Sequence, residues 1–118
     1  MGHVTVRITI ANPIDNDLKS EVEGLVDTGA TFTVVPRSLA ADLKLPITGR
    51  GRVRTAAGDL TIDRGRALVQ IDGQSEINPV YICDTVDKVL IGVVTLETLA
   101  LTVNQKTGEL SEADLLWY

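Results

Sequence analysis

Short stretches in which apolar and polar residues alternate recur along most of this chain. In residues 4–10, valine or isoleucine occupies every second position, and threonine or arginine fills the positions between them. This two-residue period is typical of a strand with one buried face. The same period, or a short apolar run, predicts further strands at 18–26, 32–35, 48–55, 60–71, 77–83, 89–91, 101–104 and 109–110.

Two segments carry apolar residues at helical spacing instead. In 36–43, a proline occupies the first turn, and Leu39, Ala40 and Leu43 lie three or four positions apart. A proline is well tolerated at that place because the first helical amide has no partner within the helix. The second short helix is predicted at 94–99.

Turn residues separate the predicted strands. The turns and connections are expected at 12–16, 56–59, 72–73, 84–87 and 106–108. Inside the strand 60–71, Gly65 predicts a bulge or bend, and Pro79 predicts an edge position or an irregularity in 77–83. Many short strands with two small helices favour a mainly β fold, either a closed barrel or a sandwich.

Length and composition narrow the class of protein. The chain has 118 residues, which predicts one domain over 1–118. Hydrophobic residues make up 44% and aromatic residues only 3%, so we expect an aliphatic core. The net charge of -5 disfavours nucleic acid as a partner, since phosphate backbones repel an acidic domain.

The sequence also carries predictions about location. It has no apolar run of about 20 residues and no basic and apolar leader, so neither a membrane span nor a secretion signal is expected. Cys83 is the only cysteine, which excludes an internal disulfide and fits a reducing, cytoplasmic compartment. In its apolar surroundings Cys83 is expected to be a small core residue.

Few residue types remain that could do chemistry. His3 is the only histidine, so Ser-His and Cys-His catalysis lack support, and no His and Cys cluster suggests a transition metal. We therefore expect no metal site and no cofactor. Carboxylates are the plausible catalytic groups.

One carboxylate stands out by its surroundings. Asp27 lies between the apolar runs 25–26 and 32–35, and Thr28 and Gly29 follow it directly. A carboxylate between two strands is costly to bury unless it is hydrogen-bonded, and a glycine lets another group approach closely. The segment therefore predicts a rigid loop that presents one acid, although an ordinary strand-to-turn junction has a similar composition.

A second motif lies near the end of the chain. Residues 89–92 read Val-Leu-Ile-Gly and lead into the second predicted helix, while residues 25–30 read Leu-Val-Asp-Thr-Gly-Ala. With the glycine-marked hairpin at 56–59 between them, this order resembles retropepsin-type aspartic proteases. The similarity is to the retroviral proteases and, in style, to small prokaryotic members of the clan. It extends from the first strand to Leu110.

The resemblance implies a fold, an assembly and a reaction. The fold is a closed antiparallel retropepsin-like barrel with one or two short helices and a flap hairpin. The assembly is a homodimer across the Asp27 loop, because only one Asp-Thr-Gly occurs in the chain. Two Asp27 carboxyls would share one proton, titrate as a unit and activate a water to hydrolyse a peptide bond. No covalent intermediate, metal or cofactor is required.

The resemblance also assigns roles to single residues. Asp27 is the expected catalytic residue. Thr28 and Gly29 are the expected supporting residues, with Thr28 bracing the paired loops. A peptide or protein substrate is expected to contact Gly29, Ala30, Ala56, Ala57 and Gly58.

Some positions depart from the retroviral pattern. Where retroviral enzymes carry acids after the motif and an arginine after the later glycine, this chain has Thr31, Phe32 and Val93. The charged residues are absent from all of these positions together, which fits the loss of an ion pair. The apolar tail within 111–118 has no counterpart, and it either adds to a dimer interface, covers a barrel edge or forms a frayed end. The alternative function is a weak or inactive retropepsin-like module that dimerises and binds peptides.

A basic stretch surrounds the proposed flap. It contains five arginines, at positions 50, 52, 54, 64 and 66. They either select acidic peptides or form the solvated faces of two paired strands, and the second interpretation is favoured because charge runs usually are solvated faces. Asp59 and Asp84 are expected to be surface turn residues.

Overall fold

Nine strands and two short helices make up the described part of the chain. The computed structural model describes residues 4–56, 58–104 and 106–112. The strands are β1 (Thr5–Ala11), β2 (Lys19–Val26), β3 (Thr33–Pro36), β4 (Ile47–Thr55), β5 (Gly58–Ile71), β6 (Gln74–Cys83), β7 (Val89–Ile91), β8 (Leu101–Asn104) and β9 (Glu109–Glu112). The helices are α1 (Arg37–Asp42) and α2 (Val93–Thr98). Every expected strand and helix is present, with ends that differ by up to three residues.

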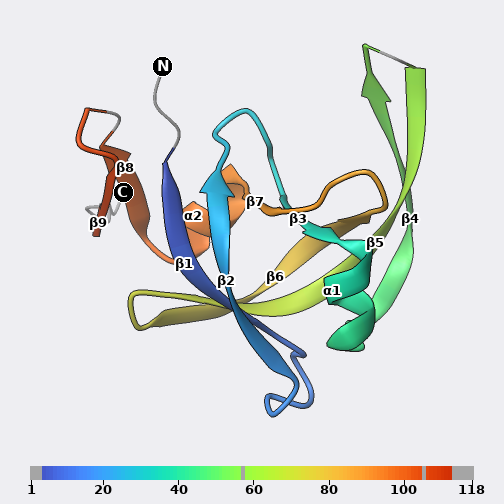
Figure 1. The fold of residues 1–118 in the computed structure, drawn as a ribbon, viewed down its shortest axis with the longest axis horizontal. Helices are drawn as coiled ribbons and strands as arrows, with labels where there is room; N and C mark the ends of the chain where they lie inside the picture. Colours follow the sequence, from blue (N-terminus) through green and yellow to red (C-terminus); the bar gives the residue numbers. More distant parts are fainter. Residues whose placement is uncertain (1–3, 57, 105, 113–118) are drawn as a thin grey trace, which may run out of the picture.

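Six of the strands close into a barrel. Neighbours follow the order β1-β2-β7-β3-β6-β5, and β5 pairs back onto β1 (Figure 1). The barrel is therefore confirmed over the sandwich. Its pairings are not all antiparallel, because β2 pairs with β7 and β3 pairs with β6 in parallel. Parallel neighbours need long crossover connections. In the sheet, β7 lies between β2 and β3 and pairs with the last residues of β2.

The interior of the barrel is aliphatic, as the composition predicts. Ile10, Val35, Ala67, Val69 and Ile91 are completely buried. They come from four strands around the ring, β1, β3, β5 and β7, and their side chains meet in one core. Full burial of a valine or isoleucine side chain stabilises the fold by about 1.5–3 kcal/mol.

The strand irregularity predicted at Gly65 lies in the facing strand instead. Gly65 pairs with both Ile47 and Val80, and β5 runs through it without a break. The register shift occurs in β4, between Ile47 and Gly49. Gly65 is nevertheless needed, since a Cβ there would lie 2.6 Å from the carbonyl oxygen of Pro46. The glycine marks a close approach of two backbones and not a bulge of its own strand.

The proline in β6 lies where only one neighbouring strand, β5, pairs with β6. β6 pairs with β5 along most of its length, including Pro79 with Arg66. On its other side, β3 pairs only with Val80 to Cys83. β6 is thus not an edge strand of the sheet, but Pro79 lies one residue before the second partner begins. Its missing N–H therefore costs no ladder bond on that side.

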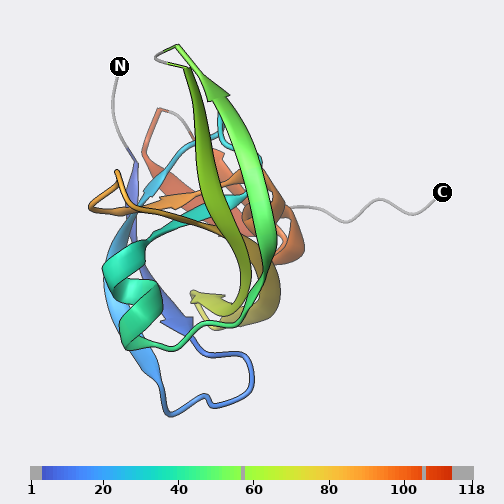
Figure 2. The ribbon, with the colours of Figure 1, turned by 90° about the vertical axis from the view of Figure 1, so that its right-hand side faces the viewer.

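β4 and β5 form a long hairpin that extends beyond the barrel. Figures 1 and 2 show its tip at the same end of the molecule as the loop that follows β2. The pairing continues out to Thr55 and Gly58. Ala57, Met1 to His3 and residues 113–118 lie outside the described residues, so the expectations for them stay predictions. Within the described ranges, no helix is long and apolar enough to cross a membrane.

Candidate active site

The backbone holds Asp27 at the end of β2. β2 pairs with β7 up to Val26 and Ile91, and the Asp27 N–H then donates to the Ile91 carbonyl at 3.0 Å. The ladder thus continues one step into the loop. Asp27 is half-buried, while Thr28 and Gly29 are exposed.

The Asp27 carboxylate takes part in its own turn. Its Oδ1 accepts the Gly29 N–H at 3.0 Å, and its carbonyl accepts the Ala30 N–H at 3.0 Å. In the described part of the chain, the other carboxylate oxygen has no hydrogen-bond partner. The turn therefore fixes the direction of the side chain and leaves one oxygen available to a water or a second carboxyl.

The start of α2 secures the other side of the loop. The Val93 N–H donates to the Ala30 carbonyl, and the Val94 N–H donates to the Thr31 carbonyl, both at 2.9 Å. The first amides of a helix have no partner within the helix, so the loop satisfies groups that would otherwise need water. The backbone amides of Val93 and Val94 thus hold the loop against the start of α2.

Gly92 lets the two backbones approach this closely. A Cβ built on Gly92 would lie 2.5 Å from the carbonyl carbon of Phe32 and 2.8 Å from the carbonyl oxygen of Thr31. Real Cβ atoms do not approach backbone atoms at such distances. The glycine of the second motif is therefore a packing requirement of the Asp27 loop.

A buried pair of hydroxyl groups lies beneath the loop. Thr33 and Thr95 are completely buried, and their hydroxyl oxygens are 2.6 Å apart. The Thr33 hydroxyl also accepts the Gly92 N–H at 3.0 Å. This network joins β3, α2 and the end of β7, although the two threonines are 62 positions apart in the sequence.

We expect Thr33→Val to destabilise the protein more than Thr95→Val. Thr33→Val leaves both the buried Gly92 N–H and the Thr95 hydroxyl without this partner, whereas Thr95→Val leaves the Gly92 hydrogen bond intact. A buried polar group without a partner costs about 1–3 kcal/mol. Urea denaturation of both variants measures the difference, and equal losses would show that Gly92 does not depend on Thr33.

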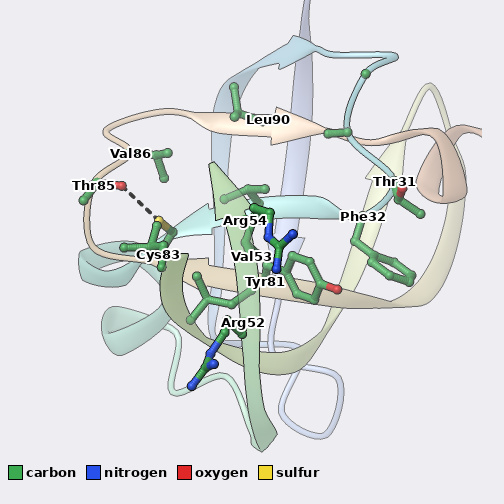
Figure 3. A pocket seen from close by; sticks show the side chains of 15 residues that line it. Thr31, Phe32, Arg52, Val53, Arg54, Tyr81, Cys83, Thr85, Val86 and Leu90 are labelled. Atoms are coloured by element: carbon green, nitrogen blue, oxygen red, sulfur yellow. Dashed lines mark hydrogen bonds between the residues drawn. The ribbon is translucent and has the colours of Figure 1, made fainter. Parts of the chain in front are cut away.

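A pocket of about 660 Å³ opens between the loop and the hairpin. It is lined by Gly29, Ala30, Thr31, Phe32, Val34, Arg52, Val53, Arg54, Leu60, Ile62, Tyr81, Cys83, Thr85, Val86 and Leu90 (Figure 3). Most of these side chains are apolar, which is usual for ligand pockets. The rings of Phe32 and Tyr81 meet edge to face at 5.2 Å and form part of the wall.

The structure places the expected site residues in two groups. Gly29 and Ala30 line the pocket next to Asp27. Ala56 is exposed at the tip of the hairpin, Gly58 adopts a positive φ of 120° there, and neither lines the pocket. Ala57 lies outside the described residues. Contacts between the hairpin tip and a substrate therefore stay a prediction.

Most of the pocket wall was not predicted from the sequence. The hairpin contributes Arg52, Val53, Arg54, Leu60 and Ile62 from the strands behind its tip. The only signal in the sequence that could have found these residues was the alternation within 48–55 and 60–71, which assigned them to the two strands of one hairpin. Which face would close over the Asp27 loop depends on the barrel closure and not on local pattern.

Arg37 ties the base of the hairpin to the loop after β6. Its guanidinium donates to Asp84 on that loop at 2.8 Å and to Asp63 on β5. The hydrogen bonds that Arg37 donates to Asp84, and to a lesser degree to Asp63, raise the pKa of Arg37 above its usual value. Thr85 and Val86, which follow Asp84, line the pocket.

Other predicted surface and core residues lie where expected. Asp59 and Asp84 are exposed, and Cys83 is buried with its sulfur 3.2 Å from the Thr85 hydroxyl. Among the described residues, no group of three or more histidine, cysteine or acidic side chains could hold a metal ion.

Comparisons with known proteins agree with the fold. A solved structure titled as the EIAV protease in complex with the inhibitor HBY-793 superimposes with a TM-score of 0.69 and covers 98% of this chain and 94% of its own. The sequences are 16% identical, so this likeness shows the fold. None of the curated proteins matches the sequence. The family model for aspartyl proteases matches residues 6–95, which include Asp27 and Gly92. The chain therefore belongs to the aspartyl protease family and has the retropepsin-like fold.

Proposed function

We propose that the protein is an aspartic endopeptidase that acts as a homodimer, with Asp27 from each chain. The proposal rests on the hydrogen bonding of the Asp27 carboxylate. One of its oxygens accepts the Gly29 N–H, and the other has no hydrogen-bond partner within the described residues. The residues that line the adjoining pocket include no second carboxylate in the described part of the chain. A second copy, related by a twofold axis, supplies the same residue again.

The exposure of the loop supports such an assembly. Thr28 and Gly29 are exposed at the end of the barrel, where no described segment covers them. A twofold axis beside these residues brings the two Asp27 side chains together and places Thr28 of each chain near the partner loop. Thr28 then braces the pair with its hydroxyl, which can both donate and accept.

The proposed chemistry follows from two carboxyls at close range. Like charges about 3 Å apart are not both ionised, so the pair holds one proton, and aspartic proteases are the best-known example. The ionised carboxyl takes a proton from a water between them, and this water attacks the peptide carbonyl. The protonated carboxyl hydrogen-bonds the developing oxyanion, and a proton then passes to the leaving amine. The β4–β5 hairpin acts as the flap, with the peptide between it and residues 29–30.

A mixing experiment tests the shared site. When Asp27→Asn chains are added to wild-type chains and subunits exchange, only dimers with two Asp27 residues cleave a peptide. Random pairing then lowers the wild-type activity to about half at equal amounts and to about a tenth with a ninefold excess of the variant. The measurement is the rate of cleavage of a fluorogenic peptide.

The matched control is Asp72→Asn, which removes a carboxylate from an exposed turn. Asp72 has a positive φ of 51°, and asparagine tolerates this conformation. Addition of Asp72→Asn chains should raise the total activity. Cleavage that is unaffected by excess Asp27→Asn would contradict a site built from two chains, and absence of cleavage with retained peptide binding would indicate the inactive module.

A further inference from the structure

The pocket beside Asp27 combines apolar walls with two positive charges. Among the lining residues in the described ranges, Arg52 and Arg54 are the only charged ones. Both belong to β4, and Figure 3 shows their side chains beside Val53. The register of β4 with β5 places the two arginine side chains on the face of the hairpin that carries Asp59, and it places Val53 on the opposite face with Leu60. The apolar wall behind them includes Phe32 and Tyr81.

The spacing of the two arginines suits an extended peptide. Arg52 and Arg54 are two positions apart on one strand, so their side chains leave the same face of β4 about 7 Å apart. An extended peptide repeats its side chains at the same interval. Neighbouring residues of an extended peptide point to opposite faces, so a peptide that lies along β4 can place an apolar side chain in the pocket and the acidic side chain of a neighbouring residue near a guanidinium.

Internal ion pairs engage these arginines only weakly. Both pair with the single carboxylate of Asp59, at 3.9 Å for Arg52 and 3.6 Å for Arg54, and their side chains are 76% and 90% exposed. Exposed pairs of this kind contribute little to stability. Arg37 differs, because it donates to two carboxylates at hydrogen-bonding distance. Arg52 and Arg54 can thus exchange Asp59 for a carboxylate of a ligand at small cost.

The positive charge of the hairpin differs from the negative net charge of the whole chain. The protein has a net charge of -5, yet five of its eleven basic residues lie between positions 50 and 66. The hairpin is therefore a local positive region on an acidic protein. Such a region attracts acidic peptides and leaves the rest of the surface unfavourable to them.

We propose that Arg52 and Arg54 make the site selective for peptides in which a large apolar residue has an acidic residue close by. The apolar side chain occupies the pocket beside Phe32 and Tyr81, and the acidic side chain pairs with the two guanidinium groups. This selectivity rests on the proposed function, since it assigns the substrate class of the same cleft.

The experiment separates recognition from cleavage. Labelled peptides carry a central leucine or phenylalanine, with Glu, Gln or Lys at each of three positions on either side. Their binding to Asp27→Asn is measured by fluorescence anisotropy, and their cleavage by the wild-type protein is measured in parallel. At its preferred position, Glu should improve both Kd and kcat/KM by about fivefold over Gln, with Lys worse than Gln. High salt should reduce the difference.

Variants of the hairpin identify the residues responsible. Arg52→Gln with Arg54→Gln should reduce the ratio of Glu to Gln binding to about one, and Arg54→Glu should favour the Lys peptide. Arg66→Gln removes the same charge from β5 outside the pocket and should keep the wild-type ratio. Equal binding of Glu and Gln peptides, or a preference that survives the double substitution, would overturn the inference. Cleavage without a Glu preference refutes only the inference, whereas a Glu preference without cleavage refutes only the proposed protease.

Discussion

Asp27→Asn should lower kcat/KM for peptide cleavage by about 10⁴-fold, which is the upper range for acid and base catalysis. In the proposed dimer, the substitution removes both the base that activates water and the acid that assists the carbonyl. The asparagine side chain has nearly the same shape, and its oxygen can still accept the Gly29 N–H that Oδ1 accepts at 3.0 Å. Fold, dimer and peptide binding should therefore persist.

Three measurements on the same sample make this result decisive. Cleavage of a quenched fluorescent peptide reports activity, circular dichroism reports the fold, and sedimentation reports the dimer. Asp72→Asn serves again as the control that removes a carboxylate elsewhere, and it should retain activity. An Asp27→Asn protein that is folded and still cleaves at a rate near the wild type would exclude Asp27 from catalysis.

Gly92→Ala should lower the free energy of unfolding by about 3 kcal/mol or more. The new Cβ would lie 2.5 Å and 2.7 Å from the carbonyl carbon and oxygen of Phe32. These are backbone atoms of a segment held by the hydrogen bonds from Val93 and Val94, so they cannot rotate away as a side chain could. For a chain of this size we expect Tm to fall by about 10 °C or more.

Gly51→Ala provides the matched control for Gly92→Ala. A Cβ on Gly51 would meet its nearest neighbours, side-chain atoms of Arg64 and Ile62, at the ordinary contact distance of 3.6 Å. Gly51→Ala should therefore leave Tm nearly unchanged, so the difference in Tm between the two variants should be almost as large as the fall caused by Gly92→Ala. Equal stability of the two would mean that the backbones of the loop and α2 can separate without loss.

Local pattern was enough to predict the elements around the site. The alternation in residues 4–10 and 18–26, together with the turn between them, predicts β1 and β2, which follow one another in the chain and pair as antiparallel strands. Asp27 stood out because an acid directly after an apolar strand needs a hydrogen-bonded turn, and the Gly29 N–H provides it. Such features depend on residues close in the sequence.

Features that depend on distant pairing were not predictable in the same way. The parallel pairing of β3 with β6 joins Val35 to Ile82 across two strands and a helix, and no local period encodes it. The contact of Thr33 with Thr95 follows from that topology. Likewise, Arg52 and Arg54 looked like ordinary solvated residues, and their exposure agrees, but the barrel closure also makes them part of the pocket wall.

A crystal structure of the assembled protein measures the central distance directly. If two chains form one catalytic site, the Asp27 carboxyl oxygens of the two chains lie within about 3 Å of each other, at hydrogen-bonding distance. A protein that cleaves peptides while its Asp27 side chains stay in separate, unpaired loops would contradict the shared site.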